Sequence, residues 1–143
     1  MNALSVLLIE DDDLDLRNAQ RAFYRRGLSN LLRVAKDAGT ALQMLRAGES
    51  ALPMPCVVLL DQELPGMSGL EFLEKLRADP GVPLVDVYYV SGRLSGQEAE
   101  RAKGLGVRAC LHKDALGTDF MALFDILESQ GHLAHIPPEM GHA

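Results

Sequence analysis

The chain has 143 residues, with 20 acidic and 14 basic side chains, so its formal net charge at neutral pH is -6. This length suits one domain with one core, and 48% hydrophobic with 24% charged residues is typical of a folded globular protein, not of a disordered or fibrous one. The acid excess disfavours nonspecific binding to nucleic acid or to anionic lipid, because both need a basic surface.

Cysteine usage and the start of the chain predict a cytoplasmic protein. Cys56 and Cys110 are far apart and each lies inside an apolar run, which is unlike the disulfide framework of a small secreted protein. The first residues lack the basic, apolar and small-residue pattern of a secretory leader, and no apolar stretch approaches the length of a membrane span. We therefore expect reduced thiols and no membrane contact.

Five short apolar runs alternate with segments of helical spacing. The runs predict strands over residues 5–10, 31–35, 56–61, 84–90 and 107–111. The other segments predict helices over residues 13–26, 39–47, 68–77, 95–104 and 118–130. The first and third runs are apolar almost throughout, as expected for central parallel strands that helices cover on both faces. The strict alternation predicts an α/β fold with one doubly wound, five-stranded parallel sheet.

Residues 1–143 are predicted to form a single domain. No repeat, low-complexity stretch or linker divides them. The alternating pattern covers a core of residues 4–130, whereas residues 131–143 have no periodicity and are expected to form a tail. In doubly wound sheets ligands bind beyond the carboxyl ends of the strands, so functional residues are expected there.

Reactive side chains follow four of the five predicted strands. Glu10 and Asp11 end the first strand, Asp61 the third, Ser91 the fourth and Lys113 the fifth. Carboxylates that converge in one cleft repel each other and raise each other's pKa unless a cation lies among them, and such hard oxygen ligands suit Mg²⁺. The lysine and the serine would then offer a positive charge and a hydroxyl to a phosphoryl group.

Each of these residues alone is more often an ordinary surface group. Asp12 and Asp13, for example, fit a solvated helix start that the helix dipole stabilises. The coincidence of acids, hydroxyl and ammonium, each at the carboxyl end of a strand and in this order, favours a functional site.

Over about residues 4–130 the chain resembles the receiver domain of two-component response regulators. The matching stretches are VLLIEDD at 6–12, VVLLDQELPGMSG at 57–69, VSG at 90–92 and LHK at 111–113. The resemblance implies a flavodoxin-like (βα)5 fold with strand order 2-1-3-4-5. It also implies a protein that is not an enzyme in the ordinary sense, since such a domain catalyses only its own phosphorylation and dephosphorylation.

The resemblance also implies roles for the strand-end residues. Asp61 is the expected phosphoacceptor, Ser91 the switch hydroxyl and Lys113 the contact to the phosphoryl group. The expected Mg²⁺ ligands are Glu10, Asp11, Asp61 and the backbone carbonyl of Glu63. An in-line attack by the acceptor carboxylate on a phosphohistidine would then transfer the group, with the metal and the lysine neutralising charge.

The partner implied by this chemistry is a sensor histidine kinase. Only 13 residues, 131 to 143, follow Gln130, so we expect output by protein–protein interaction or phosphorelay, with no nucleic-acid partner. A narrower resemblance to stand-alone regulators of bacterial phytochrome kinases rests on arginines in the first helix, the RVAKD stretch at 33–37 and a long last helix. It suggests a bacteriophytochrome as the kinase.

One departure from the family pattern and one pair of residues near the acceptor produce hypotheses. Cys110 occupies the position three before the lysine where receivers usually have an aromatic residue, so the rotating-ring part of the switch is in question. Glu63 and Arg93 flank the expected path of a hydrolytic water and are predicted to set the lifetime of the phosphorylated state. We also consider a homodimer through the fourth helix, fifth strand, fifth helix and tail. Its apolar stripe would comprise Leu123, Phe124, Leu127, Leu133 and Ile136.

Three alternatives have different signatures. A receiver-like adaptor that acts without phosphorylation would not need the complete acid, serine and lysine set. A flavin carrier of the same architecture would need a hydroxyl- and glycine-rich phosphate loop, whereas the acidic run at 10–13 would repel the flavin phosphate. A haloacid-dehalogenase-like phosphatase would need a second aspartate two residues after Asp61, where the chain has Glu63.

Overall fold

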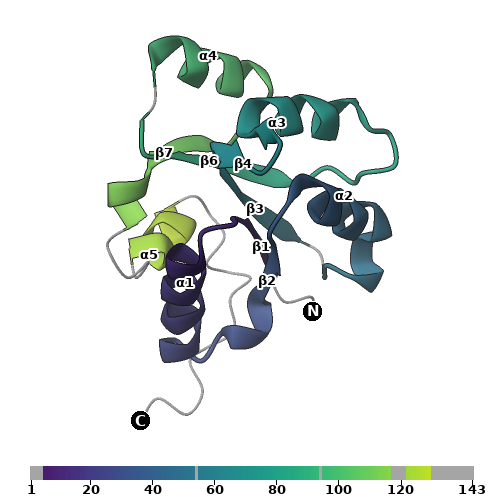
Figure 1. The fold of residues 1–143 in the computed structure, drawn as a ribbon. Helices are drawn as coiled ribbons and strands as arrows, with labels where there is room; N and C mark the ends of the chain where they lie inside the picture. The colour runs from purple at the N-terminus through teal and green to yellow at the C-terminus, as the bar shows by residue number, and fades with distance from the viewer. Residues whose placement is uncertain (1–4, 54, 94, 117–121, 130–143) are drawn as a thin grey trace.

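The computed structural model describes all residues except 1–4, 54, 94, 117–121 and 130–143, and has one five-stranded parallel sheet (Figure 1). Its order is β2-β1-β3-β6-β7, which is 2-1-3-4-5 when these strands are counted along the chain, so the predicted fold class is confirmed. The strands are β1 (Ser5–Ile9), β2 (Leu32–Ala35), β3 (Cys56–Asp61), β6 (Asp86–Ser91) and β7 (Ala109–His112).

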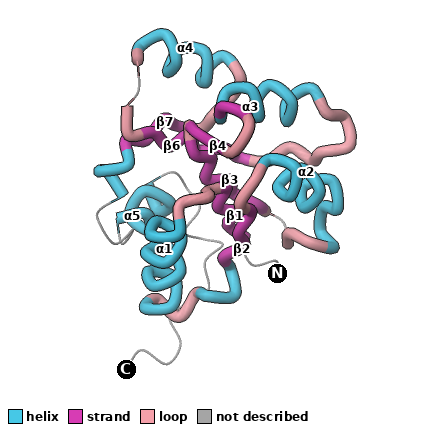
Figure 2. The backbone as a smooth tube through the Cα atoms, viewed as in Figure 1, coloured by secondary structure: helices cyan, strands magenta, loops and turns pink. Residues whose placement is uncertain are grey.

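Helices cover both faces of this sheet (Figure 2). One face carries α1 (Asp13–Arg25) and α5 (Ala122–Ser129). The other carries α2 (Ala38–Ala47), α3 (Gly69–Ala78) and α4 (Gly96–Gly104). Short 3-10 turns join several of these elements: η1 (Ser29–Leu31), η2 (Gly48–Ser50) and η3 (Lys113–Leu116).

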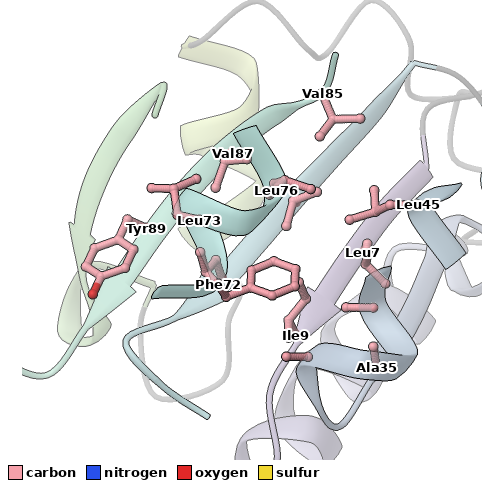
Figure 3. Close-up of a cluster of buried hydrophobic side chains, with 14 of the residues drawn as sticks. Leu7, Ile9, Ala35, Leu45, Phe72, Leu73, Leu76, Val85, Val87 and Tyr89 are labelled. Carbon is pink, nitrogen blue, oxygen red and sulfur yellow. The ribbon is translucent and has the colours of Figure 1, made fainter. Parts of the chain in front are cut away.

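Two hydrophobic clusters, one on each face, hold the layers together. Along β1, Val6 and Leu8 join the α1 and α5 side, whereas Leu7 and Ile9 join the α2, α3 and α4 side (Figure 3). This division follows from strand geometry, because successive side chains point to opposite faces. Both faces are buried, so the strand reads as a continuous apolar run in the sequence.

Local signals in the sequence account for the helix ends. The Asp12 side chain caps α1 by accepting hydrogen bonds from the amides of Leu14 and Asp15, as expected for a solvated helix start. Ser68 and Glu71 form the capping box that opens α3. The same helix ends at Ala78, and its C-cap Asp79 is followed by a proline that cannot continue it.

The structure differs from the sequence prediction at three places near the strands. A small antiparallel hairpin, β4 (Glu63–Leu64) with β5 (Met67–Ser68), follows β3 and turns at Gly66, whose φ is 79°. β6 begins two residues later than predicted, and Leu84 is 92% exposed. β7 also begins later, because the amide of Val107 closes the end of α4 by donating to Ala102.

No described helix has the length and apolar character needed to cross a membrane. The predicted tail, residues 131–143, lies outside the described residues.

Gly69, the first residue of α3, packs directly against the end of β3. A Cβ atom at this position would lie 2.5 Å from the backbone oxygen of Asp61 and 2.9 Å from Cε1 of Tyr89. The Gly69 amide also donates to the carbonyl of Gln62 at 2.6 Å. The close approach explains why a residue without a side chain occupies this position, and it fixes the turn after the predicted acceptor.

Gly69→Ala is therefore expected to lower the free energy of unfolding by about 1–3 kcal/mol, because backbone atoms cannot yield to the added methyl group. Gly104→Ala is the matched control, since a Cβ there meets nothing within 4 Å and alanine favours a helix. Urea denaturation of both variants measures the difference. Equal stability of the two variants would contradict the packing described.

Candidate functional site

Three carboxylates meet at the carboxyl edge of the sheet. Glu10, Asp11 and Asp61 each offer one oxygen atom, and these atoms lie within 4.8 Å of one another. Strand register produces this meeting, because Ile9 pairs with Leu60 and the next residue of each strand is an acid. The predicted convergence is thus confirmed.

Burial makes this cluster costly without a cation. Glu10 and Asp61 are only 4% and 8% exposed, whereas Asp11 is exposed. Burial and then the charge of Asp61 raise the pKa of Glu10 to about 7, although the amide of Asp12 partly opposes this by hydrogen bonding. Burial also raises the pKa of Asp61, against the opposing effects of Lys113 and the amide of Glu63. Desolvation therefore exceeds mutual repulsion as the cause.

Lys113 carries the positive charge at this edge, as predicted. Its Nζ lies 3.6 Å from a carboxylate oxygen of Glu10 and 3.6 Å from one of Asp61. Burial alone would lower the pKa of Lys113, but the hydrogen bond that it donates to Asp15 and the charges of the two buried acids raise it. The ammonium group consequently stays protonated and offsets part of the negative charge.

Asp15 is a site neighbour that the sequence analysis missed. Its carboxylate accepts a hydrogen bond from Lys113 Nζ at 3.0 Å. This distance is shorter than those from Nζ to the buried acids Glu10 and Asp61, which are both 3.6 Å. Asp15 lies in the first turn of α1, three residues after the N-cap Asp12. In sequence it looks like one more helix-start acid, and only the packing of α1 beside the edge reveals the contact.

Ser91 is fully buried at the end of β6, one residue beyond the partner of Asp61 in the strand register. Its hydroxyl contacts Oε1 of Gln62 and the carbonyl of Arg93, and it accepts a hydrogen bond from the Arg93 amide at 3.0 Å. The hydroxyl is thus engaged with its own loop and with the residue that follows Asp61.

A cleft of about 430 Å³ gives solvent access to this edge. It is lined by Asp61, Gln62, Glu63, Gly92, Arg93 and Lys113. Glu63 and Arg93, both exposed, therefore border the opening above Asp61, where the lifetime hypothesis needs them.

The donor set suits a small hard cation. Carboxylate oxygens are the ligands that Mg²⁺ prefers, and three of them leave positions for water and a phosphate oxygen. Zinc would more often recruit histidine or cysteine ligands, and the cluster contains neither.

Comparison with known proteins agrees with this geometry. A model of the response regulator receiver domain matches residues 6–125. The chain belongs to the response regulator receiver domain family. Receiver domains bind a divalent metal at an acidic site, and the Glu10, Asp11 and Asp61 cluster is that site's counterpart here.

Individual proteins are similar to this receiver domain over most of its length. The bacteriophytochrome response regulator RtBRR is 30% identical, with a TM-score of 0.69 over 92% of this chain and 79% of its own. A response regulator in red light signaling of R. palustris is 27% identical and has a TM-score of 0.70; the match covers 99% of this chain and 96% of that one. The protein-glutamate methylesterase/protein-glutamine glutaminase of Agrobacterium fabrum is 35% identical over 82% of the chain, which spans 32% of that protein.

The raised pKa of Glu10 predicts a pH effect on stability. Between about pH 4.5 and about 7 the metal-free folded domain binds more protons than the unfolded chain, so its free energy of unfolding falls as pH rises through this window. Glu10→Gln removes this contribution. Near pH 4.5 the variant and the wild type should have similar free energies of unfolding, and above about pH 7 the variant should be the more stable.

Urea denaturation at several pH values with a chelator present measures this difference. Glu100→Gln, at an exposed carboxylate on α4, is the control. Parallel stability curves for the wild type and Glu10→Gln would contradict the burial effect.

Proposed function

We propose that this receiver domain accepts a phosphoryl group on Asp61 from a sensor histidine kinase. The observation that carries the proposal is the position of the Asp61 carboxylate. It ends β3, opens to the cleft, lies beside two further acids and is 3.6 Å from Lys113. An anionic phosphoryl group arriving through the cleft would meet the acceptor and its neutralising charges together.

The chemistry follows from those positions. A carboxylate oxygen of Asp61 attacks the phosphorus of a phosphohistidine in line, the P–N bond breaks, and the electron pair leaves with the imidazole nitrogen, which takes up a proton. Lys113 turns from Asp15 and Asp61 toward the phosphoryl oxygens. Glu10, Asp11 and Asp61, together with the Glu63 carbonyl, would hold Mg²⁺, which would supply further charge neutralisation. Ser91 donates its hydroxyl to a phosphoryl oxygen after transfer.

The kinase partner we propose is of the bacteriophytochrome type. Support comes from the similarity to a bacteriophytochrome response regulator and to a regulator in red light signaling. The basic side chains of α1, which include Arg21 and Arg25, would give an acidic kinase surface a complementary contact.

Output is proposed to occur through protein contacts of a single receiver domain, with residues 4–130 as its core and 131–143 as a tail. The face formed by α4, β7 and α5 would bind either a target, a relay protein or a second copy of the chain. One element of the homodimer hypothesis needs correction. Leu123, Phe124 and Leu127 are buried against α1 and the sheet, and Phe124 packs edge-on against Phe23 with ring centroids 5.1 Å apart. They therefore form no exposed stripe.

Incubation with Mg²⁺ and acetyl phosphate, followed by intact mass spectrometry, tests the proposed acceptor. The wild type should gain one phosphoryl group, and Asp61→Asn should gain none because its amide is a poor nucleophile. Lys113→Ala should be phosphorylated more slowly. A wild-type chain that gains nothing would favour the adaptor that acts without phosphorylation.

Glu63 and Arg93, at the opening of the cleft, are expected to set the lifetime of the phosphorylated form. Arg93→Ala should accelerate hydrolysis by a factor on the order of 3–10, because it widens the path of the attacking water, a change of about 1 kcal/mol in the barrier. Glu63→Asn should change the same rate by removing a charge from that path. Decay of the phosphorylated mass after donor removal measures both, with Arg21→Ala on α1 as control. Unchanged decay in both variants would refute the role of this pair.

A further inference from the structure

Gln62, the residue after Asp61, connects the strand edge to α4. Its backbone is held from both sides, because its amide donates to the Val90 carbonyl at 2.9 Å and its carbonyl accepts from the Gly69 amide at 2.6 Å. Its side-chain oxygen contacts the hydroxyl of Ser91. Its side-chain nitrogen points the other way, to Glu98 in the first turn of α4.

Glu98 is the meeting point of this network. Its carboxylate oxygens accept hydrogen bonds from Nε2 of Gln62 at 2.6 and 2.8 Å, and Oε2 also accepts from the hydroxyl of Tyr89 at 2.5 Å. The side chain is half-buried, and hydrogen bonds to a charged acceptor in such surroundings are stronger than neutral ones. The network therefore fastens the start of α4 to the ends of β3 and β6.

The aromatic ring in this network is tightly packed. Tyr89 is fully buried at the edge of the cluster drawn in Figure 3, and its ring packs so closely on Gly69 that no Cβ would fit between them. In the strand register Tyr89 pairs with Cys110, the position where an aromatic is usual in receivers. The Sγ atom of Cys110 lies 4.0 Å from the Ala99 carbonyl of α4. The chain thus places its aromatic group one strand away, with a hydroxyl that reaches α4.

The single hydroxyl proton of Ser91 determines how the network can respond to phosphate. The Ser91 hydroxyl has one proton, which the structure directs to Gln62 or to the Arg93 carbonyl. If that proton turns to a phosphoryl oxygen, the side-chain oxygen of Gln62 loses its donor. The amide group is then less constrained, and its two hydrogen bonds to Glu98 weaken with it.

We propose that Gln62, Glu98 and Tyr89 form a hydrogen-bonded relay that transmits the engagement of Ser91 to α4, in place of an aromatic residue at position 110. The proposal rests on phosphorylation of Asp61, as set out above. Gln62 and Glu98 act as positioning residues, because the side-chain hydrogen bonds described here link them to the acceptor site through Ser91. In the unphosphorylated state the relay holds the first turn of α4 to the sheet, and phosphorylation releases it.

Hydrogen exchange at the Ala99 amide reports on the relay, since this amide donates to the Ser95 carbonyl at 3.0 Å in the first turn of α4. Exchange is followed by NMR with and without Mg²⁺ and acetyl phosphate, and intact mass gives the phosphorylated fraction. In the wild type, exchange should rise about fivefold on phosphorylation, the change expected for the loss of one hydrogen bond.

Glu98→Gln breaks the relay with little change of shape, and Tyr89→Phe removes only the hydrogen bond that Tyr89 donates to Glu98. In Glu98→Gln an amide donor faces the donors of Gln62 and Tyr89. Glu98→Gln should exchange fast without phosphate and show no further rise on phosphorylation, whereas Tyr89→Phe, which keeps both hydrogen bonds from Gln62 to Glu98, should exchange faster at rest and still respond to phosphate. Both variants should gain the phosphoryl group as the wild type does. Glu100→Gln, at an exposed carboxylate of the same helix, should retain the wild-type behaviour.

A double variant that swaps the two side chains, Gln62→Glu with Glu98→Gln, should rescue the relay. It restores a donor facing an acceptor, with the carboxylate now accepting from Ser91 and from α4, so slow exchange and the response to phosphate should return. A simple loss of packing would not be repaired in this way.

The outcomes separate the relay from the proposed function. A phosphorylated Glu98→Gln variant whose Ala99 hydrogen exchange rises as in the wild type would overturn the relay and leave the acceptor role intact. A Gln62→Glu, Glu98→Gln double variant that restores nothing would do the same. A wild type that gains no phosphoryl group would overturn both the acceptor role and the release of α4. Fast exchange in the unphosphorylated variants would still support the resting contact.

Discussion

The structure depends on a like-charge cluster held in a buried position. Glu10 and Asp61 must leave water because they end two central strands whose side chains are covered on both faces, and Asp11 adds a third carboxylate beside them. Desolvation keeps the pKa of both buried acids high, so the metal-free edge favours protons, Lys113 or a cation. An arrangement that is unfavourable for folding is therefore suited to recruiting a metal and a phosphoryl group.

Lys113 and Ser91 both have partners within the protein before any phosphoryl group arrives. Of the three acids beside Lys113, Asp15 is the closest. Ser91 contacts Gln62 and the carbonyl of Arg93 in the loop that follows Ser91. Phosphorylation would exchange these internal contacts for contacts with the phosphoryl oxygens. Because Gln62 also binds Glu98, the proposed relay would pass this change of contacts at Ser91 on to α4.

Hydrophobic runs and strand-end positions are local properties of the chain, and they predict the sheet and the meeting of the carboxylates. The strand order follows only from the resemblance to receiver domains. The sequence does not predict the hairpin of β4 and β5, whose strands have two residues each. It also misses Asp15 with Lys113, 98 positions apart, and Gln62 with Glu98, 36 positions apart. These contacts depend on how α1 and α4 pack at the strand edge, and the polar residues involved look like ordinary surface groups in the sequence.

Calorimetric titration with Mg²⁺ tests the central claim most directly. At about pH 6.5, in buffers of different ionisation enthalpy, binding to the unphosphorylated chain should release protons, because Glu10 with a pKa of about 7 must ionise to bind the metal. Glu10→Gln should bind more weakly and release fewer protons. Absence of binding, or binding whose proton release is the same in the variant, would contradict a buried carboxylate site built to receive a cation.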